Sequence, residues 1–560
     1  MKPFYKITGF SVGLSFLLSS CFSTNPSIIS ANPENIDRIA IKTHDLTEKE
    51  LKNWNQADLL LDTIPGMSVT RAYHEFLRKR KITPVIVAVI DSGVDIDHED
   101  LKGKIWINED EIPGNNIDDD NNGYIDDVNG WNFLGDIVGE NMEFVRILRD
   151  YKTKFEGKSA SDFTGDDLLL FEVYKRAEKE YAKEVKGNQE SLAQYEPMLK
   201  RLKLAHEFVS KQLGKDEYTL QEVKTVVTTN EEQENLKNAV VHMHANISNG
   251  ENFKSLVAGF EGYVDYLISQ KDIHLNMGLN ARKLIGDNEN DLADNKYGNN
   301  QVSGPDPKKE DAKHGTHVAG IIAANRHNRK GAKGIAEYVK VMPVRAVPDG
   351  DEYDKDIALA IRYAVDNGAK VINTSFGKYY SQHPEWVYDA IKYAATKDVL
   401  IVNAAGNDGE NLDNVDVYPN DQTLTMDEMV DNFITVGALN HTYGSALVAN
   451  FSNYGSKNVD VFAPGVKIYA STPLNTYEYL KGTSMAAPAV SGVAAVLRGC
   501  YPTLKASEIK AIIMESGNAT EASVSHGNGK VGSFASISKS GRMVNLYNAI
   551  ILAEKRSQNK

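Results

Sequence analysis

The chain contains several short, continuous runs of apolar residues that are rich in β-branched side chains. The first run occupies residues 85–90 (Val-Ile-Val-Ala-Val-Ile), and similar runs follow at 339–344, 371–374, 399–404 and 433–438. A strand that is buried on both faces has this composition, because helices cover both sides of a parallel sheet. The pattern therefore predicts the central strands of such a sheet.

Segments with a helical period lie between these runs. Ile357, Ile361, Ala364 and Val365 fall on one face of a helix that Asn-Gly at 367–368 would end. Strands that alternate with amphipathic helices indicate an α/β fold with a parallel sheet covered by helices.

One long stretch breaks this alternation. Residues 136–299 are rich in Lys, Glu and Tyr, and the segments 168–185 and 192–212 have a helical period. We therefore expect a mainly helical insertion at 136–299, within one α/β domain formed by residues 82–135 and 300–556. The composition of the insertion does not decide whether it covers a cleft, restricts access or binds a partner.

The N-terminus has the features of an export signal. Lys2 and Lys6 precede an apolar stretch at 7–18, which is too short to be a permanent membrane span. Leu-Ser-Ser-Cys at 18–21 resembles a bacterial lipobox, in which the cysteine is lipidated. We expect a lipoprotein signal peptide at 1–20, a lipid on Cys21, and a tether with an N-terminal lead-in segment at 21–81. The alternative is an ordinary signal peptide with a coincidental cysteine.

The composition narrows the classes of function. The chain has 560 residues, of which 41% are hydrophobic and 25% charged, as in ordinary globular proteins. Its formal net charge of −15 argues against general nucleic-acid binding, which needs a basic surface. The second of its two cysteines is Cys500, which has no partner for a disulfide once Cys21 carries a lipid.

Three short motifs carry candidate chemistry. Asp91 directly follows the 85–90 run, His314 opens the segment His-Gly-Thr-His-Val-Ala-Gly, and Ser484 lies in Gly-Thr-Ser-Met-Ala-Ala-Pro at 482–488. A carboxylate orients an imidazole, which acts as general base towards a serine hydroxyl. Taken singly, each has a structural alternative: a turn or helix cap for Asp91, and a helix N-cap for Ser484. A metal pair of His314 with His317 lacks a third ligand at a recognised zinc spacing.

Together, in the order Asp, His, Ser, these motifs resemble the subtilisin-like serine peptidases, the subtilases of the peptidase S8 family. The resemblance covers 82–135 and 300–556. It implies a mostly parallel seven-stranded sheet with helices on both faces. It also implies a serine endopeptidase in which Asp91 orients His314, His314 activates Ser484, and an acyl-enzyme forms on Ser484.

The resemblance extends to supporting residues. Asn407, at the end of Ala-Ala-Gly-Asn, matches the asparagine that stabilises the oxyanion in this family. Ser375, Phe376 and Gly377 match the strand that binds extended substrate by main-chain hydrogen bonds. Protein or peptide substrates are implied, without an organic cofactor.

An acidic loop at 115–127 has the spacing of a calcium site. Oxygen ligands alternate around Gly123, which allows the sharp turn. The candidate ligands are Asp118, Asp120, Asn122, Tyr124 (through its carbonyl) and Asp126. Because position 12 of the loop is Asn129 and not Glu, a structural Ca²⁺ would need Asp127 or another ligand. The alternative is a solvated acidic turn. A second acidic cluster, residues 287–291 with Asp294 and Asn299, is a weaker candidate.

The sequence thus predicts an exported serine endopeptidase, lipid-anchored on a bacterial membrane in the periplasm or at the cell surface. Residues 21–81 show no βαβ pattern, so we do not expect a conventional prodomain there. Two rivals remain: a catalytically silent lipoprotein that binds a partner through the insertion, and an esterase-type acyl hydrolase. The latter is disfavoured because Ser484 lacks a Gly-x-Ser-x-Gly elbow.

Overall fold

The computed structural model describes residues 37, 42, 44–244, 247 and 252–558. The predicted signal peptide at 1–20, Cys21 and the start of the predicted tether lie outside the described residues. Across the described ranges, every helix is either too short or too polar to cross a lipid bilayer.

The main sheet of the described chain has nine strands in the order β10-β13-β7-β6-β5-β4-β1-β3-β2. They are β1 (Val85–Asp91), β2 (Trp131–Asn132), β3 (Val339–Arg345), β4 (Val371–Thr374), β5 (Leu400–Ala404), β6 (Phe433–Leu439), β7 (Val461–Pro464), β10 (Asn518–Ala519) and β13 (Arg542–Met543). In the order of the sheet, the seven neighbouring strands β7-β6-β5-β4-β1-β3-β2 are all parallel, which confirms the predicted mostly parallel sheet.

Two further strands extend this sheet at one edge: β13 pairs parallel with β7, and β10 pairs antiparallel with β13. Each has only two residues, too few to give a periodic signal in the sequence. Two separate hairpins complete the strands: β8 (Ile468–Thr472) with β9 (Thr476–Leu480), and β11 (Ser523–His526) with β12 (Lys530–Ser533).

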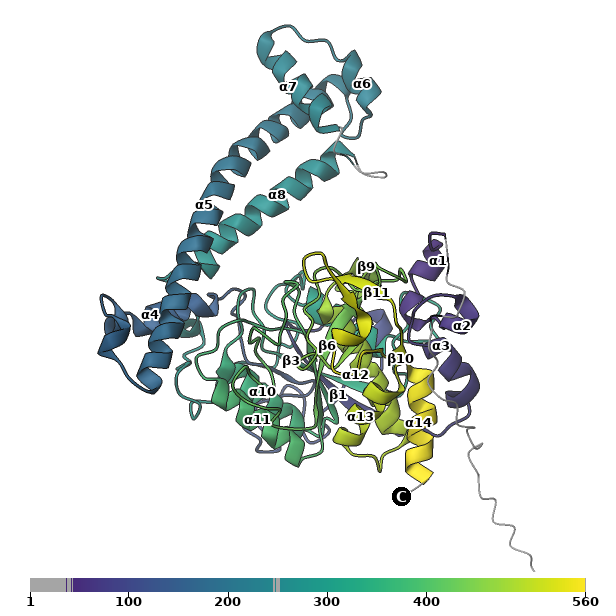
Figure 1. The fold of residues 1–560 in the computed structure, drawn as a ribbon. Coiled ribbons are helices and arrows are strands. Elements are labelled where there is room, and N and C mark those ends of the chain that lie inside the picture. Colours follow the sequence, from purple (N-terminus) through teal and green to yellow (C-terminus); the bar gives the residue numbers. More distant parts are fainter. Residues whose placement is uncertain (1–36, 38–41, 43, 245–246, 248–251, 559–560) are drawn as a thin grey trace, which may run out of the picture.

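Helices cover both faces of the sheet (Figure 1). Val87 and Val89 of β1 join an apolar core with α9 (Lys313–Ala323) and α12 (Thr483–Cys500). Ala88 and Ile90 point the other way and join a core with α10 (Asp354–Asp366) and α11 (Pro384–Thr396). The continuous apolar run thus arises because alternate side chains of one strand enter two different cores. The chain ends with α13 (Ala506–Ser516) and α14 (Leu546–Gln558).

The described part of the N-terminal segment is folded onto this body. It forms α1 (Glu48–Leu51), η2 (Trp54–Gln56), α2 (Leu59–Asp62), α3 (Val69–Ala72) and η3 (Tyr73–Leu77), with α3 beside α14 (Figure 1). Trp54 is 1% exposed, belongs to the same core as β1, and donates from Nε1 to the carbonyl of Val466 at 3.0 Å. Residues 54–77 are therefore an integral layer of the body.

The predicted helical insertion is a long arm that projects from the body (Figure 1). It comprises α4 (Glu143–Phe155), α5 (Asp166–Leu213), α6 (Leu220–Thr225), α7 (Glu231–Met243) and α8 (Phe253–Ser269). The 48 residues of α5 correspond to a length of about 72 Å at 1.5 Å per residue. At the tip, α5, α6, α7 and α8 share an apolar cluster of their own. Asn132 and Asn299 exchange two backbone hydrogen bonds, so the chain leaves and re-enters the body at neighbouring points.

Candidate active site

The carboxyl end of β1 and the first turn of α9 bring Asp91 and His314 together. The Nδ1 of His314 donates to Oδ1 of Asp91 at 2.7 Å, and the same oxygen accepts the backbone N–H of Ser92 at 2.8 Å. Asp91 is 1% exposed, whereas the His314 side chain is 37% exposed. The buried carboxylate therefore fixes the orientation of an imidazole whose other nitrogen, Nε2, stays available.

Electrostatics at this pair favour the protonated imidazole. Burial alone would lower the pKa of His314, but the charge of Asp91 and the hydrogen bond between the two outweigh it. The net effect raises the pKa of His314 above its ordinary value of 6.5. An imidazole with this property is a stronger base than an isolated histidine.

Ser484 is the second residue of α12, which packs against α9 and against β1. Its hydroxyl donates to the carbonyl of Ser375 at 3.1 Å, and the Ser375 hydroxyl donates to the Ser484 carbonyl at 3.0 Å. Among the described residues, no hydrogen bond joins Ser484 to His314; such catalytic bonds are often loose until substrate is present. The start of a helix also carries partial positive charge that favours a nearby anion.

Asn407 follows β5 with its side-chain amide held in one orientation. Its Oδ1 accepts the backbone N–H of Thr483 at 2.9 Å and the Thr483 hydroxyl at 3.1 Å. Because the oxygen is engaged with α12, the amide N–H group is the part left free to donate. Thr483 is thus a positioning residue that sequence reasoning missed, although it directly precedes the candidate nucleophile.

The predicted substrate strand continues from β4. Ser375 is buried, Phe376 is half-buried, and Gly377 is exposed. Asn373 ties this segment to α12, since its Nδ2 donates to Ser375 Oγ at 2.8 Å and its Oδ1 accepts from Ser491 at 2.9 Å. The strand edge and the helix that carries Ser484 are therefore fixed relative to one another.

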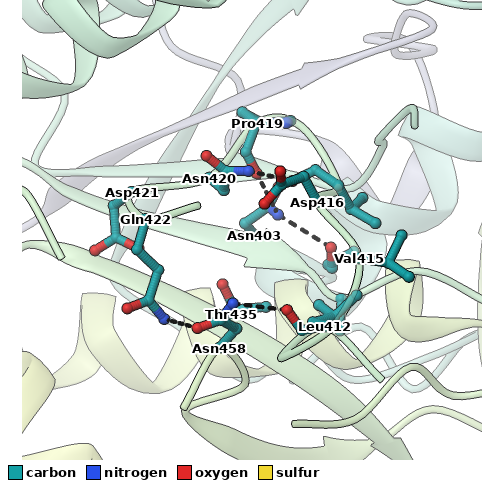
Figure 2. A pocket seen from close by; sticks show the side chains of 13 residues that line it. Asn403, Leu412, Val415, Asp416, Pro419, Asn420, Asp421, Gln422, Thr435 and Asn458 are labelled. Carbon is teal, nitrogen blue, oxygen red and sulfur yellow. Dashed lines mark hydrogen bonds between the residues drawn. The ribbon is translucent and has the colours of Figure 1, made fainter. Parts of the chain in front are cut away.

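A small polar pocket supports the strand that leads to Asn407 (Figure 2). Asn403 at the end of β5 donates from Nδ2 to the carbonyls of Ala404 and Pro419, at 3.0 and 3.2 Å. Asn458 closes another side by donating to the Leu412 carbonyl at 2.7 Å. With a volume of about 20 Å³, the pocket has room for one water-sized molecule and not for a substrate side chain.

His317 belongs to the packing of α9 and not to the site. It is completely buried, and its Nε2 donates to the carbonyl of Ile468 at 3.1 Å. Burial lowers the pKa of His317 to about 3, so the ring is neutral.

The acidic loop between Leu101 and β2 gathers a different set of carboxylates from the one that the spacing predicts. Oxygen atoms of Glu111, Asp120 and Asp127 all lie within 4.8 Å of one another. Burial is the main factor that raises the pKa of Glu111 and of Asp127, and Oε2 of Glu111 is buried without a hydrogen-bond partner. Asp120 was a predicted ligand; Glu111 was missed because it lies outside the twelve-residue loop pattern.

The other predicted ligands have different surroundings. Asp126 accepts the backbone N–H groups of residues 114, 115 and 116 at 2.8, 3.2 and 2.8 Å, so its carboxylate stabilises a neighbouring turn. Asp118 accepts the N–H groups of Asn122 and Gly123 within the loop. The ring of Tyr124 packs against Trp131, and Asn122 donates from Nδ2 to Asp120 and Asp127 at 3.0 and 3.2 Å.

One residue of the weaker acidic segment, Asp287, belongs to a buried ion-pair network. Arg282 donates to Asp287 from Nε at 2.6 Å and binds Asp356 through two bonds of 2.7 and 2.8 Å. Lys355 also pairs with Asp287. All four side chains are shielded from solvent, and the two cations already neutralise the carboxylates. Asp287 is therefore already engaged by two cations, and calcium at this segment stays a prediction.

Comparisons with known proteins identify the family of the chain. The family model described as "Subtilase family" matches residues 83–531. A thermophilic serine proteinase of Bacillus sp. (strain AK1) is 43% identical over 185 residues, which cover 33% of this chain and 42% of that protein. Subtilisin DY of Bacillus licheniformis is 35% identical over 210 residues, covering 37% of this chain and 72% of that protein. A solved protease structure from Pseudoalteromonas arctica PAMC 21717 has 30% sequence identity and a TM-score of 0.36, over 43% of this chain and 70% of that one.

Proposed function

The chain belongs to the subtilase family, and on this premise we propose that it is a serine endopeptidase that hydrolyses peptide bonds of proteins through Asp91, His314 and Ser484. The observation that carries the proposal is the 2.7 Å hydrogen bond from His314 Nδ1 to the buried Asp91. That bond fixes the tautomer in which Nε2 accepts a proton, as a serine peptidase requires.

In the proposed reaction, His314 Nε2 removes the proton of the Ser484 hydroxyl as Ser484 Oγ attacks the peptide carbonyl carbon. The negative charge that develops on the carbonyl oxygen is stabilised by the amide N–H of Asn407 and by the backbone N–H of Ser484. The imidazolium then gives its proton to the leaving amine, the C–N bond breaks, and an acyl-enzyme remains. His314 next removes a proton from water, which hydrolyses the ester and restores Ser484.

Substrate would bind as an additional strand along Ser375, Phe376 and Gly377. A Cβ at Gly377 would approach the Tyr418 carbonyl to 3.1 Å, so this exposed position has little room for a side chain. Main-chain hydrogen bonds at such an edge give affinity, and adjacent pockets select side chains.

Labelling with a serine-reactive fluorophosphonate, alongside hydrolysis of an unstructured protein, tests the proposal. We expect labelling and hydrolysis by the wild type, and loss of both in Ser484→Ala with an unchanged melting temperature. Ser255→Ala, an exposed serine on α8, is the matched control and should behave as wild type. A wild type that folds but neither labels nor hydrolyses would support the silent binding protein instead. Hydrolysis of esters but not of peptides would support the esterase.

Within this function we propose a structural calcium ion at Glu111, Asp120 and Asp127. Their clustered oxygens are the hard ligands that Ca²⁺ prefers, and the buried, unpartnered Oε2 of Glu111 provides one ligand atom without breaking a hydrogen bond. A divalent cation would also offset the mutual repulsion of three carboxylates.

Thermal unfolding with and without chelator tests the calcium site. At a Ca²⁺ concentration of 100 times Kd, binding adds about 2.7 kcal/mol to the free energy of unfolding. Chelation should therefore lower Tm, and Ca²⁺ should restore it. Asp120→Asn should weaken this response, whereas Asp291→Asn, in the second acidic segment, should retain it. A Tm that is insensitive to chelator in the wild type would refute the site.

We further propose that the chain is exported and anchored through a lipid on Cys21, either in the periplasm or at the cell surface. The support is the sequence pattern alone: a basic start, a short apolar stretch and a lipobox-like Leu-Ser-Ser-Cys at 18–21. Stable anchoring needs more than one acyl chain. Metabolic labelling with a fatty-acid probe should mark the wild type, and Cys21→Ala should lose the label and leave the membrane fraction. Equal labelling of both proteins would refute the anchor.

A further inference from the structure

A groove of about 870 Å³ lies between the catalytic body and the base of the helical arm. It adjoins the proposed substrate strand, because its lining includes Gly377 and also Asp408, the residue after Asn407. From there it reaches the arm, whose α5 contributes Arg176, Glu180, Lys183 and Glu184 and whose α8 contributes Tyr266. The two walls thus come from segments that are far apart in the sequence.

The arm wall is fixed to the body at its base. The guanidinium of Arg176 lies 4.4 Å from the ring centroid of Tyr380 and donates to the Tyr379 carbonyl at 3.2 Å. Around this contact, Phe171 and Tyr174 of α5 are buried in one apolar cluster with Phe144 and Tyr380. On the α8 side, His274 contacts Asp349 at 3.3 Å. Moving the wall away would expose this buried cluster, so the cluster holds the base of the arm against the body.

The charges that face the groove are mainly negative. Lys183 lies 2.9 Å from Glu180 and 3.2 Å from Glu184, so one ammonium serves two carboxylates. The buried Lys378 is neutralised from behind by Glu143 and Asp354, at 3.3 and 2.9 Å.

On the body side, Asp408 and Glu410 are exposed. Asp408 accepts a hydrogen bond from the Tyr379 hydroxyl at 2.6 Å, and within the described chain neither carboxylate forms an ion pair. Of the exposed or half-buried charged side chains that line the groove, the acids (Glu180, Glu184, Asp349, Asp408 and Glu410) therefore outnumber the bases (Arg176 and Lys183).

Resting on the peptidase activity proposed above, we propose that this groove holds an extended segment of the substrate polypeptide that carries basic side chains, with the base of the arm as its outer wall. An extended chain paired with Gly377 continues directly into the groove, where main-chain groups and long cationic side chains meet exposed carboxylates. The insertion then acts as a substrate-selecting wall next to the catalytic centre.

Peptide hydrolysis by the full-length protein tests this proposal. The substrates are a tripeptide amide, which ends before the arm, and two longer peptides with the same cleaved bond and either lysines or glutamates in the preceding positions. The wild type should give a higher kcat/KM on the lysine peptide than on the glutamate peptide, and high salt should reduce the difference.

Glu180→Gln with Glu184→Gln removes two carboxylates from the arm wall. The ratio of kcat/KM for the lysine peptide to kcat/KM for the tripeptide should fall about fivefold, mainly through a higher KM. This fall corresponds to about 1 kcal/mol of binding free energy lost with two half-exposed carboxylates. The matched control is Glu178→Gln with Glu196→Gln, two exposed residues of α5 that lie about 160° around the helix from Glu180. This control should keep the wild-type ratio.

Each outcome decides the question. An unchanged ratio in the arm-wall variant, or an equal fall in the control, would overturn the groove assignment. A wild type that labels with fluorophosphonate and cleaves the tripeptide, but does not distinguish lysine from glutamate peptides, would overturn the groove alone. A folded wild type that neither labels nor cleaves any peptide would overturn the peptidase itself, and the groove with it.

Discussion

Gly315 lies at the closest approach between the two elements that carry the proposed acid–base pair. A Cβ built at this position would lie 2.1 Å from the carbonyl oxygen of Gly93 and 3.1 Å from Cβ of Asp91. Ordinary van der Waals contact begins near 3.4 Å, so Gly315→Ala requires α9 and the end of β1 to separate by about 1.3 Å. The atoms that clash are backbone atoms, which a side-chain rotation does not relieve.

The separation acts directly on the 2.7 Å bond between Asp91 and His314, because His314 is the neighbour of Gly315. We expect a loss of about 1–3 kcal/mol in the free energy of unfolding from overpacking. We also expect a fall in kcat/KM of about 10²-fold, as a misplacement of 1 Å produces in an active site.

Thermal unfolding and hydrolysis of a chromogenic peptide measure the two effects separately. Gly187→Ala in α5 is the matched control, since nothing lies within 4 Å of its added Cβ. In that helix interior the change should stabilise by up to about 1 kcal/mol and leave hydrolysis unchanged. Wild-type Tm and wild-type kcat/KM in Gly315→Ala would refute the reasoning. A lower Tm with normal kcat/KM would show that packing, and not the pair, depends on Gly315.

Two further predictions concern the active site, and a third concerns the N-terminal layer. Because Asp91 raises the pKa of His314, kcat/KM should rise with pH through a value above 6.5 as the imidazole loses its proton. In Asp91→Asn this rise should move to lower pH and reach a lower plateau. A pH–rate profile in which the rise stays in place would contradict this. Asn407→Asp keeps an acceptor for the helix start but removes the amide donor, so kcat should fall by at least about 10²-fold, the lower end of the range known for another subtilase, with little change in KM. Trp54→Ala should lower the free energy of unfolding by about 3–5 kcal/mol in chemical denaturation, and a loss below 1 kcal/mol would show that the N-terminal layer does not contribute to the core.

The sequence allowed the parallel sheet to be predicted because its strands are buried on both faces and therefore read as continuous apolar runs. The residues at their carboxyl ends, Asp91 and Asn407, could be located for the same reason. The N-terminal layer escaped detection because its buried residues, such as Trp54 and Met67, stand singly among polar neighbours. No periodic pattern marks them; their burial depends on tertiary contacts, such as the hydrogen bond from Trp54 to Val466, 412 residues away.

The acidic loop shows a second reason why local patterns fail. A spacing rule assumes that every alternate oxygen points to one centre, and Asp126 fits the rule in sequence. In the folded chain Asp126 is 4% exposed, and its carboxylate accepts hydrogen bonds from three backbone N–H groups of residues 114–116. A buried carboxylate without such partners would be costly, so these bonds fix its orientation. Glu111 contributes to the cluster from outside the pattern, through a fold of the loop that the spacing does not encode.

The ion pairs at the base of the arm are best understood as determinants of geometry. Glu143 of α4 contacts Lys378 at 3.3 Å, and Lys378 directly follows Gly377 of the proposed substrate strand. Both side chains are almost completely shielded from solvent, so much of their mutual attraction offsets the cost of removing them from water. Such a pair adds little net stability, but it has a narrow range of favourable positions. This contact therefore fixes the position of α4 relative to the strand edge. A displacement of α4 should also displace Gly377 in the active site.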